Sequence, residues 1–185
     1  MQRAVFLDRD GVLNRVFVRD GVTYPPASIA ELELLPGVVQ AVRTLAQHNL
    51  RRIVVTNQPD VARGTQTRAM VEQVNQQIAA QLPLDDIVTC FHDNTDHCAC
   101  RKPRPGLLIL AAQRYSLDLA HSFMVGDRWS DIVAGQAAGC YTILIMTPYS
   151  QAARCMPDAA AANLPEAVQH IIEHIRKEPH DDANA

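Results

Sequence analysis

The chain has 185 residues, 48% of them hydrophobic, and a formal net charge of −3. This length can bury one sizeable core but is short for two, so we expect one domain at 1–178 and a frayed polar tail at 179–185. The Lys and Arg residues are scattered, which argues against nucleic acid or an anionic membrane as a partner. Without a signal-peptide pattern or a membrane-length apolar run, the sequence predicts a cytoplasmic protein. We expect a monomer.

Short apolar runs alternate with segments of helical periodicity along the chain. The runs predict strands at 4–8, 52–56, 86–91, 122–127 and 141–146. Apolar residues three and four apart predict amphipathic helices at 37–50, 68–82, 106–117, 130–139 and 165–177. This alternation is typical of the α/β class, and we expect a Rossmann-like, doubly wound parallel sheet with helices on both faces.

Polar residues follow several of the predicted strands. Asp8 closes the first strand, Thr56 and Asn57 close the second, and Asp127 closes the fourth. Lys102 lies in a loop before a helix. Because ligands bind beyond the carboxyl ends of parallel strands, we expect these side chains to meet at one edge of the sheet.

Asp8 and Asp10 are two residues apart, so in an extended segment both carboxylates point the same way. Gly11 then allows the chain to turn away. Two carboxylates held together repel each other unless a cation lies between them or one keeps its proton. The alternative is a pair of solvated loop carboxylates.

Four motifs give this pair a context. The segments "FLDRDGVLN", "VVTNQ", "RKPRPG" and "GDRWSDI" resemble, in this order, the four motifs of the haloacid dehalogenase superfamily of phosphatases, over residues 4–146. The resemblance implies that Asp8 is the nucleophile and that Asp10 is the general acid and base. It also implies that Thr56 and Lys102 hold the transferring phosphoryl group. The predicted activity is therefore Mg²⁺-dependent hydrolysis of a phosphomonoester through an aspartyl-phosphate.

The same resemblance implies a magnesium site. Asp127 would bind Mg²⁺ together with the Asp8 carboxylate and the backbone carbonyl of Asp10. Asp131 would be a further acid behind the site, although helix capping alone could account for it. Arg101 can add positive charge beside the equatorial phosphoryl oxygens.

A second cluster has the spacing C-x-H-x5-C-x-C within residues 90–100. Its members are Cys90, His92, Cys98 and Cys100. Four such ligands saturate a tetrahedral ion, so this loop predicts a structural Zn²⁺ site that holds Arg101 and Lys102 in place. His97 could replace His92 as the imidazole ligand, and reduced thiols without a metal are the alternative. Cys140 and Cys155 are expected to be ordinary buried or surface residues.

The zinc pattern narrows the resemblance to the branch that contains heptose 1,7-bisphosphate phosphatases and histidinol-phosphate phosphatases. The segment "TNQPDVARG" is closer to the heptose enzymes, whereas the short gap between His92 and Cys98 resembles the histidinol-phosphate branch. Removal of the 7-phosphate of D-glycero-D-manno-heptose 1,7-bisphosphate is the preferred prediction. A histidinol-phosphate phosphatase and a non-catalytic zinc-binding module are the alternatives.

Chain length leaves no room for a separate cap domain, so we expect an open site. Specificity would then come from loops at 15–26, 57–63 and 101–104, which suit a small phosphorylated sugar or amino alcohol. The candidate substrate-binding residues are Asn57, Gln58, Arg63 and Arg101. Arg63 is a candidate for recognising the distal phosphate of a bisphosphate.

Overall fold

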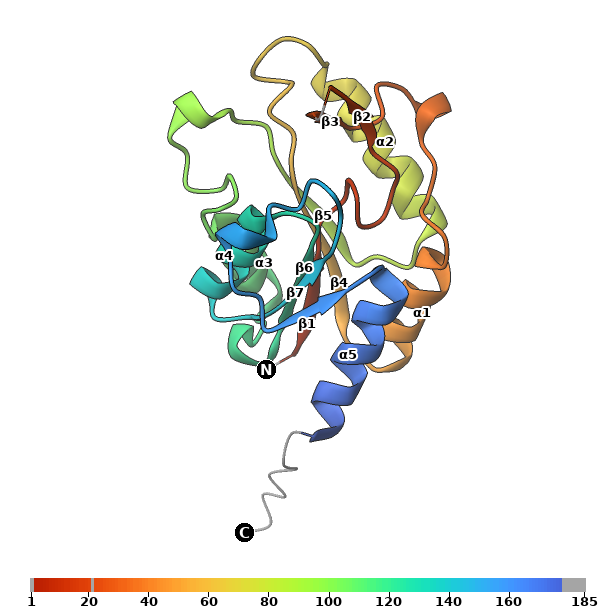
Figure 1. Cartoon of the computed structure of the whole chain (residues 1–185), viewed down its shortest axis with the longest axis vertical. Coiled ribbons are helices and arrows are strands. Elements are labelled where there is room, and N and C mark those ends of the chain that lie inside the picture. Colours follow the sequence, from red (N-terminus) through yellow and green to blue (C-terminus); the bar gives the residue numbers. More distant parts are fainter. Residues whose placement is uncertain (1, 21, 178–185) are drawn as a thin grey trace.

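A parallel six-stranded sheet forms the centre of the computed structural model, which describes residues 2–20 and 22–177 (Figure 1). The strand order is β5-β4-β1-β6-β7-β8. The strands are β1 (Ala4–Leu7), β4 (Arg51–Asn57), β5 (Asp86–Cys90), β6 (Phe123–Gly126), β7 (Tyr141–Ile145) and β8 (Ala159–Ala161). The five strands predicted from the sequence are confirmed to within two residues at each end. β8 escaped prediction because three alanines show neither alternation nor β-branched residues.

Five helices cover the two faces of this sheet, as the doubly wound prediction requires. They are α1 (Val38–Gln47), α2 (Arg68–Gln81), α3 (Gly106–Tyr115), α4 (Trp129–Ala138) and α5 (Leu164–Lys177). Val5 and Leu7 pack in one apolar cluster with α1, α2 and α5, whereas Ala4 and Phe6 pack in another with α3 and α4. Alternate side chains of β1 therefore pack into the cores on opposite faces of the sheet. Short 3₁₀ helices lie at Ile29–Glu31, Asn94–Asp96, Leu119–His121 and Ala152–Arg154.

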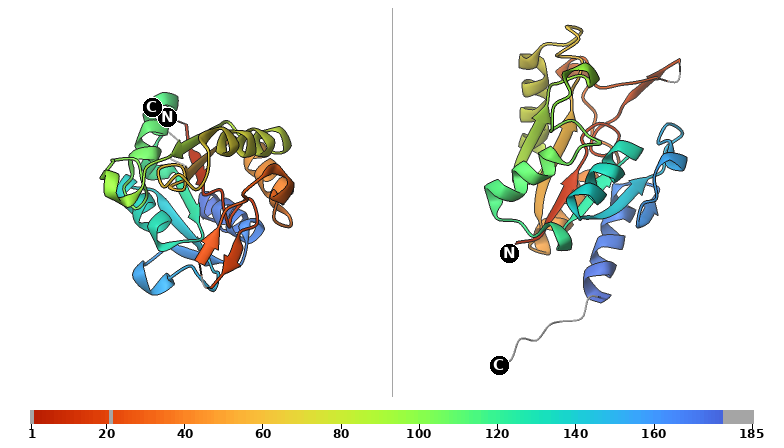
Figure 2. Two further views of the ribbon diagram at one scale, coloured as in Figure 1. Left: turned by 90° about the horizontal axis from the view of Figure 1, so that it is seen from above. Right: turned by 90° about the vertical axis from the view of Figure 1, so that its left-hand side faces the viewer.

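The predicted substrate-facing segment, residues 15–26, contains a two-stranded antiparallel hairpin. Its strands are β2 (Phe17–Arg19) and β3 (Val22–Tyr24). The hairpin projects beyond the body of the sheet in the right-hand view of Figure 2. Within the described residues it is the insertion after β1, and no cap domain accompanies it.

The strand order places the functional segments side by side. β1 pairs with both β4 and β6, with Leu7 opposite Val54 on one side and Val125 on the other. The chain leaves β1 toward β4 and β5 and then crosses to β6, β7 and β8, so the order reverses around β1. This is where open α/β sheets bind ligands.

Two expectations lie outside what the structure tests. The predicted frayed tail at 179–185 falls outside the described residues, and the assignment of residues 1–178 to one domain stays a prediction. None of the helices that the structure describes is long and apolar enough to span a membrane.

Candidate active site

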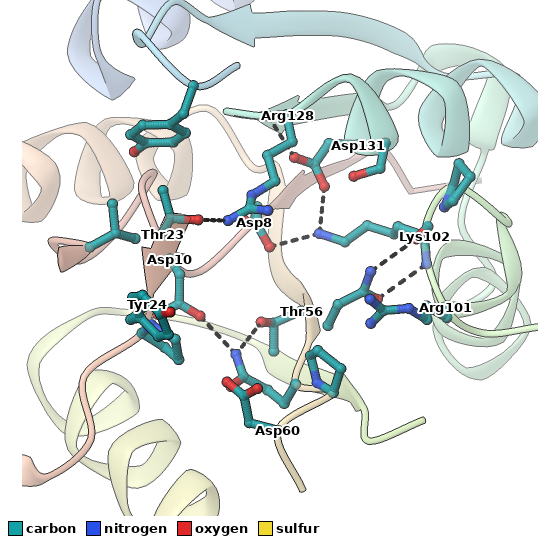
Figure 3. A pocket seen from close by; sticks show the side chains of 18 of the residues that line it. Asp8, Asp10, Thr23, Tyr24, Thr56, Asp60, Arg101, Lys102, Arg128 and Asp131 are labelled. Carbon is teal, nitrogen blue, oxygen red and sulfur yellow. Dashed lines mark hydrogen bonds and ion pairs between the residues drawn. The ribbon is translucent and has the colours of Figure 1, made fainter. Parts of the chain in front are cut away.

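A pocket of about 630 Å³ opens beyond the carboxyl ends of β1 and β4 (Figure 3). Its lining brings together side chains from all four sequence motifs and from the β2–β3 hairpin. The predicted site residues along its wall are Asp8, Asp10, Thr56, Asn57, Gln58, Arg63, Arg101, Lys102 and Asp131. Asp127 is fully buried next to Asp8 rather than exposed on the wall.

The Lys102 ammonium group lies at the base of the pocket and joins three segments. Its Nζ is 2.7 Å from Asp8 Oδ1 and 2.7 Å from Asp131 Oδ1, and it donates a 2.7 Å hydrogen bond to the carbonyl of Val55. Lys102 is only 4% exposed, so these oxygens replace the water that it gives up on folding.

Burial and charge set the protonation of this group of residues. Burial raises the pKa of Asp8 to about 6, although Lys102 opposes the increase. Burial lowers the pKa of Lys102, but the ion pairs with Asp131 and Asp8 outweigh it and raise the pKa above its ordinary value. Lys102 is therefore a permanent cation facing the Asp8 carboxyl.

The Asp10 carboxylate is held by donors from three directions. Arg9 donates from Nε and Nη2, at 3.1 and 2.8 Å from Asp10 Oδ2. Asn14 Nδ2 donates to Oδ1 at 2.9 Å, and Gln58 Nε2 donates to Oδ2 at 2.7 Å. The carboxylate is thereby fixed at the pocket wall beside Asp8.

The end of β4 supplies Thr56 and the two residues after it. Gln58 Nε2 also donates to Thr56 Oγ1 at 2.9 Å, so the Thr56 hydroxyl proton is free to point into the pocket. Asn57 accepts from the Lys102 backbone N–H at 3.1 Å and donates to the Lys102 carbonyl at 3.0 Å. The amides of Asn57 and Gln58, expected from the sequence to bind substrate, are thus engaged in positioning Lys102, Thr56 and Asp10.

Asp127 is a buried carboxyl that forms no ion pair with a described lysine or arginine, and its neighbour is the Tyr149 hydroxyl, whose pKa is raised by burial and by this carboxyl. It is 0% exposed, and no described amide or cationic side chain donates a hydrogen bond to either oxygen. Burial, with further contributions from Asp8 and Asp131, raises its pKa well above the ordinary value. A Cβ at Gly11, which has φ +92°, would collide with this carboxylate, which explains the glycine after Asp10.

The carboxylates have the composition and spacing of a hard-cation site. One oxygen from each of Asp8, Asp127 and Asp131 lies within 4.8 Å of the others. Lys102 pairs with Oδ1 of both Asp131 and Asp8, so Asp127 and the second oxygen of Asp8 are the candidate ligands of the ion. These residues fit Mg²⁺, which prefers one or two carboxylates together with substrate phosphate oxygens.

Three guanidinium groups line the outer part of the pocket. Arg63 donates to both oxygens of Asp93 at 2.8 and 2.7 Å, and Arg101 donates to Asn94 Oδ1 at 2.8 Å. Arg128 donates to the Thr23 hydroxyl of the hairpin, and its charge opposes the increase in the pKa of Asp127. Unlike Arg63, Arg128 thus donates to a neutral hydroxyl and not to a carboxylate.

The cysteine-rich loop forms a compact cluster beside the pocket. One ligand atom from each of Cys90, His92, Cys98 and Cys100 lies within 4.8 Å of all the others. His92, and not His97, contributes the imidazole, because His97 lies outside this group. The four atoms have the identity and number of a closed zinc site. Outside the cluster, Cys140 is buried in the apolar core, and that burial raises its pKa to about 12.

Several site residues were not found by sequence reasoning. Arg9, Asn75 and Arg128 contact the motif residues or line the pocket, yet none was among the candidates. Arg9 and Arg128 lie inside two of the four motifs, and this position could have marked them as candidate site residues. Asn75 lies in a helix of mixed polarity, where nothing distinguishes it from neighbouring amides.

Comparisons with known proteins agree with this geometry. The family model described as HAD-hydrolase-like matches residues 99–176. An Escherichia coli D-glycero-beta-D-manno-heptose-1,7-bisphosphate 7-phosphatase is 34% identical, with 90% of this chain and 93% of that protein covered. A Bordetella bronchiseptica protein of the same name is 37% identical, with 78% and 81% covered.

A solved structure gives the same result for the fold. The D,D-heptose 1,7-bisphosphate phosphatase from B. bronchiseptica, complexed with magnesium and phosphate, superposes with a TM-score of 0.81 at 31% identity. The alignment covers 94% of this chain and 99% of that one. The predicted family and fold class are confirmed.

Asp127→Asn should stabilise the metal-free protein and abolish its response to Mg²⁺. A carboxyl whose folded pKa lies above its unfolded value destabilises the fold increasingly as pH rises above about 4. At pH 8 with a chelator, we therefore expect the variant to exceed wild type in free energy of unfolding by about 1 kcal/mol or more, and the difference to shrink toward pH 4. Urea denaturation with and without Mg²⁺ measures both effects, and Asp20→Asn on the exposed hairpin is the control. Equal stabilisation of wild type and Asp127→Asn by Mg²⁺ would contradict the site.

Proposed function

The chain belongs to the haloacid dehalogenase-like phosphatases, and we propose that it hydrolyses the 7-phosphate ester of D-glycero-D-manno-heptose 1,7-bisphosphate with Mg²⁺ as its catalytic ion. The observation that carries the proposal is the Lys102 ammonium, buried between Asp8 and Asp131 at the base of a pocket whose outer part is cationic. The names of the relatives supply the substrate class.

In the first step, an Asp8 carboxylate oxygen attacks phosphorus and forms an aspartyl-phosphate. Asp10 gives its proton to the departing sugar oxygen. In the second step, Asp10 accepts a proton from the water that attacks the aspartyl-phosphate, which restores Asp8 and releases phosphate. The donors around Asp10 keep its carboxyl at the pocket wall during both steps.

The transferring group carries negative charge that this pocket is built to compensate. The Thr56 hydroxyl and the Lys102 ammonium donate to the phosphoryl oxygens, and Asp131 keeps Lys102 directed toward Asp8. Mg²⁺ held by Asp8, Asp127 and the Asp10 carbonyl supplies further positive charge against the same oxygens when bound.

The cationic outer part of the pocket supports a bisphosphate over a monophosphate. Arg63 and Arg101 are tied to the zinc loop through Asp93 and Asn94, whereas Arg128 is held only by a neutral hydroxyl. A second phosphate would give the Arg128 guanidinium an anionic hydrogen-bond acceptor in place of a neutral one. The short gap in the cysteine loop favours histidinol phosphate as the second candidate substrate.

The cysteine loop is proposed as a structural Zn²⁺ site. Cys90, His92, Cys98 and Cys100 would hold the ion and leave no position open for water. Asn94 and Asp93 follow His92 in the same loop and contact Arg101 and Arg63. The ion would thereby fix these pocket guanidinium groups as well as the approach to Lys102.

Asp8→Asn should lower phosphate release by about 10³-fold or more, because the amide is a poor nucleophile for phosphorus. Wild type and variant are compared on heptose 1,7-bisphosphate, fructose 1,6-bisphosphate and histidinol phosphate, with and without Mg²⁺. We expect the highest kcat/KM for the heptose compound. A preference for histidinol phosphate would favour the second candidate, and turnover of none of the three would refute both.

Arg128→Ala should raise KM for heptose 1,7-bisphosphate by roughly 10-fold or more, since a charge-assisted hydrogen bond contributes about 1.5–3 kcal/mol. KM for a heptose 7-monophosphate should change little. Arg63→Ala is measured in parallel, and we expect a smaller difference between the two substrates because Asp93 already neutralises Arg63. Equal increases for both substrates in Arg128→Ala would remove the role in recognising the second phosphate.

Cys98→Ser should deprive the purified protein of zinc and lower its melting temperature and kcat/KM, because the loop that carries Arg101 and Lys102 loses its anchor. Metal analysis should find about one Zn²⁺ per wild-type chain. Cys155→Ser, outside the cluster, should keep both zinc and activity. Full metal content in Cys98→Ser would argue against the tetrahedral site.

A further inference from the structure

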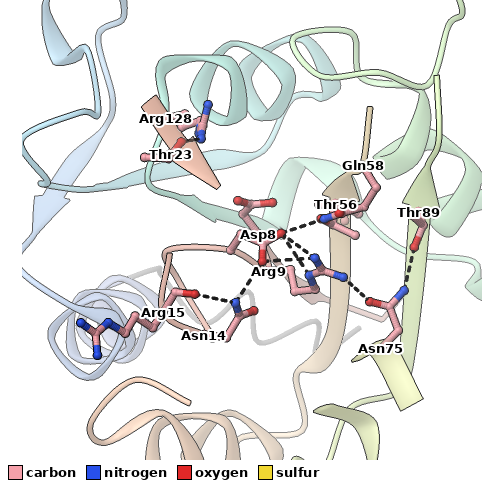
Figure 4. A network of polar contacts seen from close by, with 12 residues as sticks. Asp8, Arg9, Asn14, Arg15, Thr23, Thr56, Gln58, Asn75, Thr89 and Arg128 are labelled. Carbon is pink, nitrogen blue, oxygen red and sulfur yellow. Dashed lines mark hydrogen bonds and ion pairs between the residues drawn. The ribbon is translucent and has the colours of Figure 1, made fainter. Parts of the chain in front are cut away.

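A buried arginine stands between the two catalytic carboxyls in the sequence, and among the donors around Asp10 it is the one that also contacts a helix outside the pocket. Arg9 is 1% exposed and is the largest of the fully buried side chains. An arginine so placed requires hydrogen-bond acceptors, because an unpaired buried charge is strongly destabilising. Its two acceptors are Asp10 on one side and Asn75 of α2 on the other. Figure 4 shows the contact between Arg9 and Asn75.

The contact with Asp10 uses the fork of the guanidinium. Nε and Nη2 both donate to Asp10 Oδ2, at 3.1 and 2.8 Å, and Nη2 is also 3.2 Å from Oδ1. Two N–H groups on a rigid plane fix the orientation of a carboxylate in a way that a single ammonium cannot.

The third guanidinium nitrogen, Nη1, connects Arg9 to α2 and, through it, to β5. Arg9 Nη1 donates to Asn75 Oδ1 at 2.8 Å, and Asn75 Nδ2 donates to Thr89 Oγ1 at 3.1 Å. Asn75 lies in the middle of α2 and Thr89 in β5, so both sit on regular secondary structure. The chain of contacts therefore runs from the loop after β1 to two rigid elements.

We propose that Arg9 and Asn75 are positioning residues that hold the Asp10 carboxyl at the place where it protonates the leaving oxygen. The inference rests on the proposed function, in which Asp10 is the general acid. Asn14 and Gln58 also contact Asp10, but both come from loop positions next to the site. Arg9 and Asn75 supply the connection to α2 and β5.

The dependence on the leaving group separates positioning of the acid from a general loss of structure. A sugar alkoxide must be protonated as it departs, whereas nitrophenolate leaves as a stable anion and needs little help. The ratio kcat/KM covers steps up to release of the leaving group, so it excludes the later attack by water. A misplaced Asp10 lowers kcat/KM for the sugar phosphate alone, and a distorted pocket lowers both values together.

Asn75→Leu removes the anchor of Arg9 without touching the pocket. We expect kcat/KM for heptose 1,7-bisphosphate to fall about 10-fold and that for p-nitrophenyl phosphate to change less than about 2-fold. Asn75→Asp keeps an acceptor for Arg9 Nη1 and should restore most of the loss. Gln73→Leu, which also replaces an amide of α2 with leucine but at an exposed position, should leave both kcat/KM values unchanged.

Asp10→Asn in the same assay keeps the two proposals distinguishable. It should lower kcat/KM for the sugar phosphate by about 100-fold or more and spare the nitrophenyl ester. If Asp10→Asn shows this selectivity and Asn75→Leu does not, the positioning role is wrong and the proposed function stands. If Asp10→Asn lowers both substrates equally, Asp10 is not the general acid, and both assignments fall. Arg9→Lys gives an independent check, since one ammonium should reproduce the selective loss.

Discussion

The Lys102 ammonium is the contact on which the rest of the site depends. Asp8, Asp127 and Asp131 are each less than 8% exposed and close enough to share an ion, so their mutual repulsion would oppose folding without a buried cation. Lys102 forms ion pairs with Asp8 and Asp131, whereas Asp127 has no such pair and its pKa stays raised by burial. Asp127 is thus a buried carboxyl without an ion pair, and a divalent cation beside it would favour its ionised form.

Lys102 reaches this position from a loop far from Asp8 in sequence, so the loop must be held. Asn57 at the end of β4 bonds both backbone groups of Lys102, which ties the loop to the sheet. The cluster of Cys90, His92, Cys98 and Cys100 closes the same loop just before Arg101. Sheet and cluster act on adjacent residues, which explains how a loop can hold a charged group with the accuracy that phosphoryl transfer needs.

Much of this arrangement could be predicted from the sequence, because strands and amphipathic helices leave local patterns and because carboxyl ends of parallel strands converge. That reasoning located Asp8, Thr56 and Asp127 at one edge. It could not find Asn75, because a helical amide carries no signal until its partner across the fold is known. Its assignment of Asn57 and Gln58 to substrate binding stays a prediction, and their contacts with Lys102 and Asp10 could not be foreseen, because sequence does not reveal which groups a side chain meets. The three alanines of β8 form a strand because they pair with β7, and no local sequence pattern predicts this pairing.

The Asp8 and Asp10 carboxyls are held from opposite halves of the sheet. Asp8 is held through Lys102 by Asp131, at the start of α4 after β6. Asp10 is held from the other half, by Gln58 after β4 and by Arg9 with its anchor in α2. β1 lies between β4 and β6, so the strand order brings both sets of contacts to the two carboxyls. A change in packing on either side of β1 would shift these contacts without touching either carboxyl. Anchoring residues on strands and helices, and not only on loops, limit such shifts.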